Sequence, residues 1–197
     1  MYRIHKYISR AKVNKGKDSR FSQIARLGED IFYAKDLANL WQIKDTNNLY
    51  TTLKRYTQKG WLFRIYKGLY SIKPLEQLDS FKLGIKALHR YAYISTETVL
   101  ARAGFIQQEI KEITLVSSIS KRFSIGGNHY YSRQLKDNYL FNDAGVKNEN
   151  GLRIAIPERA VADLIYFNPK AFFDARKTID WKKVKEIQKE VGYPPVK

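Results

Sequence analysis

The chain has 197 residues, a length that corresponds to one or two domains. It carries 36 Lys and Arg against 19 Asp and Glu, a formal net charge of +17, but 44% of its residues are apolar and 14% are aromatic, which excludes a disordered polycation. The absence of cysteine excludes disulfides, cysteine-ligated zinc, iron–sulfur clusters and thiol catalysis. No apolar run reaches the roughly 18 residues of a membrane span, and charges interrupt the first 17 residues too often for a signal peptide. We therefore expect a soluble, cytoplasmic protein with no membrane partner, and nucleic acid is the first partner to test.

The excess positive charge is concentrated toward the N-terminus. Residues 1–75 hold 16 basic and 5 acidic side chains, whereas residues 76–197 hold 20 and 14. Residues 1–17 contain no acid and form a basic arm. This arm is either a solvated tail or a segment that contacts phosphates through Arg3, Lys6 and Arg10.

Residues 18–75 predict a winged helix-turn-helix. Ser19 is placed to cap a first helix that ends near Leu27, a second helix follows over 34–41, and Asp45 or Thr46 caps a third that ends near Gln58. Strand-forming residues at 61–65 and 69–72 flank a Tyr-Lys-Gly turn and predict a hairpin. In a winged helix-turn-helix the third helix enters the major groove, and the hairpin contacts the flanking backbone.

The third helix has the most informative pattern. Leu49, Leu53 and Tyr56 form its buried face, and no acidic residue occurs from Thr46 to Lys59. Amide and guanidinium groups pair with base edges, and Lys, Thr and Tyr reach phosphates. A merely solvated polar face is the alternative, although such faces usually mix both charge signs. The predicted DNA contacts are Asn47, Asn48, Tyr50, Thr51, Lys54, Arg55 and Gln58 in the helix, and Arg64 and Lys67 in the hairpin.

Pro74 marks a boundary, and residues 76–197 predict a mixed α+β domain. We expect a helix to about Arg90 with Phe81, Ile85 and Leu88 inward, a helix over 95–103, a strand at 113–116, a hairpin over 122–132 and a strand at 152–156. Pro157 opens the next helix at its favoured first position, and the last helix, over 181–191, buries Trp181. Three basic residues of this domain extend the expected DNA contacts: Lys121, Arg122 and Arg133.

Two segments are similar to a known family. The first comprises residues 32–38 and 59–70, and the second comprises residues 156–164 (Ile-Pro-Glu-Arg-Ala-Val-Ala-Asp-Leu). Both resemble the AbiEi antitoxins of bacterial abortive-infection systems, which are type IV toxin–antitoxin systems. The first segment is similar to the family's winged helix and the second to its Pro-Glu-Arg-Ala helix. The family commonly has a small hydroxyl residue where Tyr33 and Ile156 stand here. We therefore expect these two helices to be capped from elsewhere in the chain.

The resemblance implies a transcriptional autorepressor that binds inverted repeats in double-stranded operator DNA. It also implies an antitoxin that opposes a nucleotidyltransferase-like toxin without forming a stable complex with it. Antitoxicity is associated with the second domain, where Pro157, Glu158 and Arg159 lie. Helix capping and an ion pair within the domain are the favoured explanation of this motif, and antitoxicity is the alternative.

Other functions stay open on the residues alone. The chain could be an RNA-binding or protein-docking winged-helix factor without an operator, or, remotely, a nuclease that uses Glu109 and Lys111 before the strand at 113–116. The three histidines are far apart in sequence, and we predict no enzyme, no catalytic residue, no metal and no cofactor. A dimer and two monomers on the DNA are both compatible with the sequence.

Overall fold

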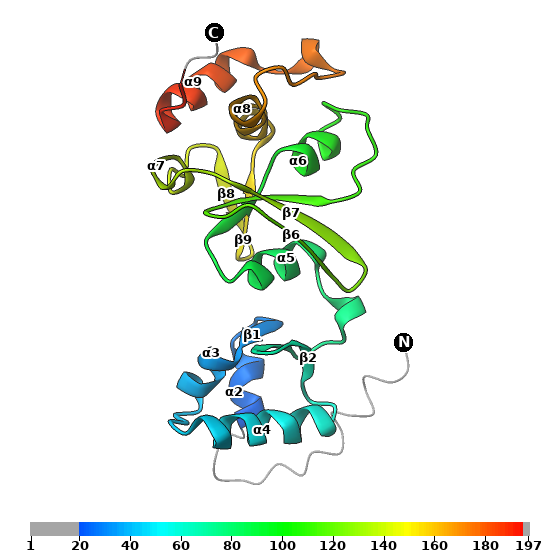
Figure 1. Cartoon of the computed structure of the whole chain (residues 1–197), viewed down its shortest axis with the longest axis vertical. Coiled ribbons are helices and arrows are strands. Elements are labelled where there is room, and N and C mark those ends of the chain that lie inside the picture. The colour runs from blue at the N-terminus through cyan, green and yellow to red at the C-terminus, as the bar shows by residue number, and fades with distance from the viewer. Residues whose placement is uncertain (1–19, 195–197) are drawn as a thin grey trace. The chain divides into compact units, whose positions relative to one another are not determined.

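The computed structural model describes residues 20–194 and has the predicted mixed α+β class (Figure 1). The chain divides into two compact units between Lys73 and Pro74, next to the predicted boundary at residue 75. The arm residues Arg3, Lys6 and Arg10 and the expected cap Ser19 lie outside the described residues.

The described part of the first unit contains three helices and one antiparallel sheet in the strand order β1-β3-β2. Strand β1 was not predicted, because three residues that lead directly into a helix are too few to show an alternating pattern. The other elements follow the predicted order, and the hairpin strands lie within two residues of the expected positions. The elements are α2 (Arg20–Arg26), β1 (Ile31–Tyr33), α3 (Ala34–Leu40), α4 (Thr46–Gln58), β2 (Phe63–Tyr66) and β3 (Leu69–Ser71).

The core of the first unit joins all three helices to the hairpin. Ile24, Leu37 and Leu53 are fully buried, one from each helix. The Tyr56 ring packs edge-on against Trp41 and Trp61, with centroids 5.6 and 5.3 Å away. Aromatic pairs at such distances stabilise a core beyond the apolar area that they bury, so α4 is fixed firmly to its support.

The second unit is built around a mixed six-stranded sheet in the order β6-β7-β5-β4-β9-β8. In Figure 1, α5 lies on one face of this sheet and α6 and α8 lie on the other, with α9 packed against α8. Neither β4 nor β8 was predicted as a strand. The helices are α5 (Ser80–Leu88), α6 (Glu97–Arg102), α7 (Asp137–Leu140), α8 (Pro157–Phe167) and α9 (Trp181–Val191), with 3-10 turns at Leu75–Gln77 and Arg176–Thr178. The strands are β4 (Ala92–Ile94), β5 (Ile113–Ser117), β6 (Lys121–Ile125), β7 (Asn128–Gln134), β8 (Val146–Glu149) and β9 (Leu152–Ala155).

Three details of the second unit differ from the prediction. Helix α5 ends at Leu88 rather than near Arg90, because His89 adopts a left-handed conformation with φ of 53°. Its most buried side is shifted toward Leu83 and Gly84, where the helix approaches the Tyr130 ring so closely that an added Cβ would lie 2.4 Å from a ring carbon. Trp181 is only half-buried, and its indole N–H donates to the Arg176 carbonyl at 2.9 Å.

Candidate nucleic-acid interface

Helix α4 begins at the predicted cap. The Asp45 carboxylate accepts a hydrogen bond of 2.6 Å from the backbone N–H of Asn48, which satisfies one of the free donors of the first turn. The predicted residues Leu49, Leu53 and Tyr56 are buried, together with Thr52. The rotation of the helix about its axis is therefore set by packing.

The opposite face of α4 is open to solvent. Each of the predicted contact residues on this helix is exposed: Asn47, Asn48, Tyr50, Thr51, Lys54, Arg55 and Gln58. The Arg55 guanidinium lies 5.7 Å from the Tyr56 ring centroid, a distance at which a cation is attracted to the ring face. The structure thus brings amides, a hydroxyl, an ammonium and a guanidinium together on one acid-free helix face.

The hairpin adds a second basic element. Arg64 on β2 and Lys67 in the turn are both exposed, and Gly68 turns the chain with a φ of 92°. The Gly68 carbonyl accepts a hydrogen bond of 2.8 Å from the Ala34 N–H at the start of α3. This bond takes over the role of the cap that Tyr33 does not supply, and it ties the hairpin turn to the helix before α4.

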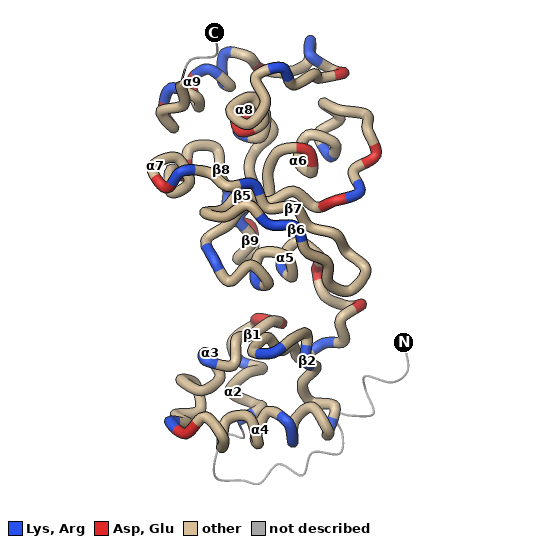
Figure 2. The backbone as a smooth tube through the Cα atoms, viewed as in Figure 1, with Lys and Arg blue, Asp and Glu red and all other residues tan. Residues whose placement is uncertain are grey.

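The three basic residues predicted on the second unit differ in their availability. Lys121 and Arg122 are exposed, but Arg122 pairs with Glu112 at 3.2 Å and stacks on the Tyr131 ring at 3.8 Å. Arg133 is the least available, because its side chain is 20% exposed and forms an ion pair with Glu97. Lys121 and Arg122 belong to β6 and Arg133 to β7, and Figure 2 shows basic positions along these two strands.

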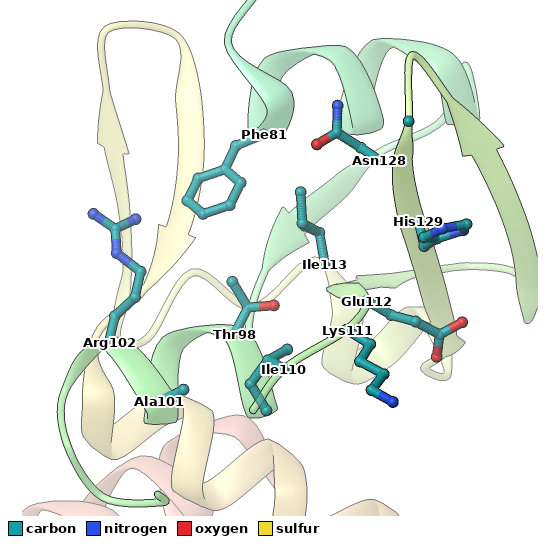
Figure 3. Close-up of a pocket in the computed structure, with 11 residues that line it drawn as sticks. Phe81, Thr98, Ala101, Arg102, Ile110, Lys111, Glu112, Ile113, Asn128 and His129 are labelled. Carbon is teal, nitrogen blue, oxygen red and sulfur yellow. The ribbon is translucent and has the colours of Figure 1, made fainter. Parts of the chain in front are cut away.

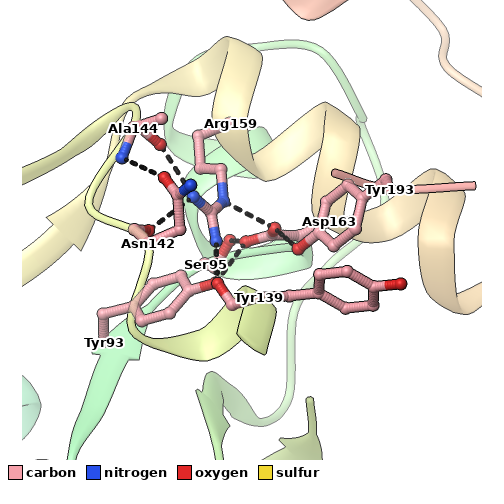
Figure 4. Close-up of polar contacts among 8 residues, drawn as sticks. All are labelled: Tyr93, Ser95, Tyr139, Asn142, Ala144, Arg159, Asp163 and Tyr193. Carbon is pink, nitrogen blue, oxygen red and sulfur yellow. Dashed lines mark hydrogen bonds and ion pairs between the residues drawn. The ribbon is translucent and has the colours of Figure 1, made fainter. Parts of the chain in front are cut away.

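The Pro-Glu-Arg motif lies at the start of α8, and its arginine faces inward. The Arg159 side chain is fully buried, and its Nε donates to the equally buried Asp163 carboxylate at 2.7 Å (Figure 4). Its other nitrogens donate to the carbonyls of Asn142 (3.0 Å) and Ala144 (2.7 Å) and to the Tyr93 hydroxyl (2.8 Å). Such a group cannot touch a partner without unfolding, so the ion pair within the domain explains Arg159.

Asp163 is the acceptor around which this polar cluster is built. It takes hydrogen bonds from the hydroxyls of Ser95 (2.7 Å), Tyr93 (3.0 Å) and Tyr193 (2.6 Å). Burial and the neighbouring carboxylate raise the pKa of Tyr93 and of Tyr193 well above the ordinary value. Both tyrosines therefore stay neutral donors, and the sequence offered no signal that they meet Asp163.

Glu158, the middle residue of the motif, points elsewhere. One of its carboxylate oxygens lies 3.5 Å from the Lys183 ammonium on α9. Pro157 occupies the first turn of α8, and Ile156 before it provides no side-chain cap. Since proline lacks an N–H, one of the usual free donors of a helix start does not exist here.

A pocket that the sequence did not predict lies between α5, α6 and the starts of β5 and β7. It has a volume of about 320 Å³ and is lined by Phe81, Arg102, Lys111, Glu112 and His129, among others (Figure 3). Glu112 is already paired with Arg122. The His129 Nδ1 lies 2.8 Å from the Ser124 hydroxyl.

The features considered for catalysis are scattered. Glu109 and Lys111 lie in the loop before β5. A nuclease of this type would hold them on the strand itself. Within residues 20–194, no group of three or more His, Cys, Asp or Glu is arranged to hold a metal ion. His89 caps α5 and His129 lies on β7, whereas His5 is outside the described residues.

The fold and the exposed face of α4 define an α+β protein with a basic helix-and-hairpin surface. No protein-family model and no curated protein matches the sequence. Within residues 20–194, no helix is long and apolar enough to cross a membrane.

Proposed function

We propose that this protein is a cytoplasmic DNA-binding repressor that inserts α4 into the major groove of duplex operator DNA. The observation that carries the proposal is the exposed face of α4, on which seven polar or basic side chains project and no carboxylate occurs. The order of the helices and the basic hairpin support it, because a winged helix-turn-helix holds DNA with its third helix and its hairpin. Asn47 and Arg55 are assigned to base edges and Lys54, Arg64 and Lys67 to phosphates.

The resemblance of residues 32–70 and 156–164 to AbiEi antitoxins adds an operator and a toxin to the proposal. On this basis the operator consists of inverted repeats upstream of the protein's own operon, and the protein opposes a nucleotidyltransferase-like toxin without a stable complex. The protein acts by binding rather than by catalysis. The burial of Arg159 supports a structural role for the Pro-Glu-Arg motif, so antitoxicity is assigned to the surface of the second unit rather than to that arginine.

The DNA-binding proposal is tested by mobility shift on the DNA upstream of the gene. Arg55→Ala should reduce discrimination between the operator and a scrambled duplex by about 1–3 kcal/mol. Lys54→Ala should weaken binding to both duplexes and lower the slope of log K against log salt by about 0.9. Unchanged affinity in both variants would reject the assignment of α4.

A matched control is available in the same unit. Lys35 and Lys44 are exposed and lie outside α4 and the hairpin, so Lys35→Ala and Lys44→Ala should leave discrimination unchanged. The antitoxin proposal is tested separately, by expressing the chain with a nucleotidyltransferase encoded next to its gene. Growth arrest that the chain does not relieve would refute that part and leave the DNA-binding part intact.

A further inference from the structure

Three exposed lysines form one flank of α9. At 100° per residue, Lys182, Lys185 and Lys189 fall within about 60° of one another around the helix axis. We call these three residues the lysine flank. None of them forms an ion pair within the described part of the chain, whereas Lys183, on the other side of the helix, pairs with Glu158.

Aromatic side chains lie in the segment before the same helix and at its first residue. Phe172 is 77% exposed, an unusual state for a phenylalanine, and it lines a cavity of about 700 Å³ together with Arg176, Lys177 and Trp181. Trp181 lies about 40° from Lys185 around α9. The aromatic cavity and the lysine flank are therefore on one side of the helix, and Figure 2 shows the basic residues recurring along α9.

Two carboxylates lie close to this surface, Asp174 in the lining of the cavity and Asp180 at the start of α9, and each accepts a hydrogen bond from a backbone N–H. Asp174 accepts from the N–H of Gln107 at 2.8 Å, and Asp180 caps α9 by accepting from the N–H of Lys183 at 3.0 Å. Glu186 and Glu190 lie farther around α9, beyond Lys182 and away from Trp181. The side of α9 that carries Trp181 therefore presents Lys185, Lys189 and aromatic rings, and the nearest carboxylate of the helix, Glu186, borders Lys182 on the edge away from Trp181.

We propose that this surface binds single-stranded nucleic acid, with phosphates along the lysine flank and a base stacked on Phe172. Proteins that hold single strands without sequence preference combine a basic track with exposed aromatic side chains. A duplex would satisfy the lysines but not Phe172, because its bases are stacked inside the helix. A peptide made only of acidic residues would likewise leave the exposed ring without a partner. This site is separate from α4 in residues, in unit and in ligand.

The test uses the full chain and a fluorescent oligodeoxythymidylate of about 12 nucleotides, a length within the range of single-strand sites. Phe172→Ala should weaken binding about tenfold, as loss of one stacked base does, whereas Phe172→Trp should keep the wild-type affinity. Replacing the three flank lysines by glutamine should lower the salt slope by about 2, because each single-strand phosphate contact contributes about 0.7.

Controls separate this site from general charge and from α4. Phe141 is 58% exposed elsewhere in the unit, so Phe141→Ala should bind normally. The triple variant K111Q/K136Q/K147Q removes three exposed lysines outside the flank and should keep the salt slope. A Lys54→Ala, Arg55→Ala variant should lose operator binding but still bind the single strand.

Several results would overturn the proposal. These are failure of the full chain to bind the single strand, wild-type affinity in Phe172→Ala, and equal losses in the flank and control lysine variants. Loss of operator binding without loss of single-strand binding in the flank variant would assign α9 to the duplex instead. Equal competition by polyglutamate would show that the surface recognises charge alone.

Discussion

Replacing Arg159 by methionine should destabilise the second unit far more than an arginine replacement at its surface. Methionine fills much of the same volume but removes every donor that the guanidinium supplies. The change leaves the Asp163 carboxylate buried without its cation, and it leaves the carbonyls of Asn142 and Ala144 without their bonds to Arg159.

The size of the effect follows from these lost partners. Removing one member of a buried ion pair costs about 3–5 kcal/mol, because a charge stays buried without compensation. Three hydroxyls, from Tyr93, Ser95 and Tyr193, still donate to Asp163. They stabilise the remaining carboxylate, so we expect the lower part of this range, about 3 kcal/mol.

Arg153 provides the matched control. It also pairs with an aspartate, Asp143, at 3.1 Å, but the two side chains are 39% and 67% exposed. Its guanidinium lies over the Tyr91 ring at 4.4 Å. Because exposed ion pairs and cation–π contacts each contribute about 0.5–1 kcal/mol at most, Arg153→Met should cost about 1 kcal/mol.

Hydrogen exchange followed by mass spectrometry at increasing urea measures both variants in the full chain. Peptides from α8 report the free energy of unfolding of the second unit, and peptides from α4 serve as the internal reference in the first. If Arg159→Met and Arg153→Met lower the protection of α8 equally, or if α4 loses protection as much as α8, the reasoning is refuted.

Three more changes have a definite sign. The folded-state pKa of Tyr193 is raised, so its contribution to the free energy of unfolding of the second unit is complete below the ordinary pKa near 10 and declines as the pH rises above it. Tyr193→Phe should make this decline of stability with pH shallower by about 1.4 kcal/mol per pH unit. An unchanged slope in pH-dependent urea unfolding contradicts the prediction. Gly84→Ala gains about 1 kcal/mol of helix propensity but forces a Cβ into the Tyr130 ring, and since overpacking costs about 1–3 kcal/mol, the melting temperature should fall; a rise contradicts the close approach. Asp45→Ala removes the bond to the Asn48 N–H and should cost the first unit about 1 kcal/mol. Hydrogen exchange of α4 measures this loss, with Asp45→Asn as the conservative control.

Local signals predicted the parts of the fold that depend on local physics. The cap at Asp45, the buried side of α4 and the start of α8 at Pro157 follow from side chains a few residues apart, and the structure places them as expected. The exposed face of α4 was predictable for the same reason, since a helical wheel needs only the sequence of one helix.

What could not be predicted depends on residues that are distant in the chain. Strand β4 is three residues long and shows no alternation, because all three residues are buried between β5 and β9. The support for α3 comes from Gly68, 34 positions after Ala34. The hydrogen-bond partners of Arg159 could not be predicted from the sequence either. The exception is Asp163, which lies one helical turn away at i+4.

The buried pair of Arg159 and Asp163 also leads to an expectation about how the second unit folds. Its partners are drawn from Tyr93 on β4, from the loop before β8 and from Tyr193 after α9, so they span about half of the chain. Desolvating both charges is favourable only when these partners are in place, and contacts between such distant residues form slowly. The hydrophobic layers of the second unit should therefore assemble around a hydrated ion pair, and expulsion of that water would be the last step toward the native state.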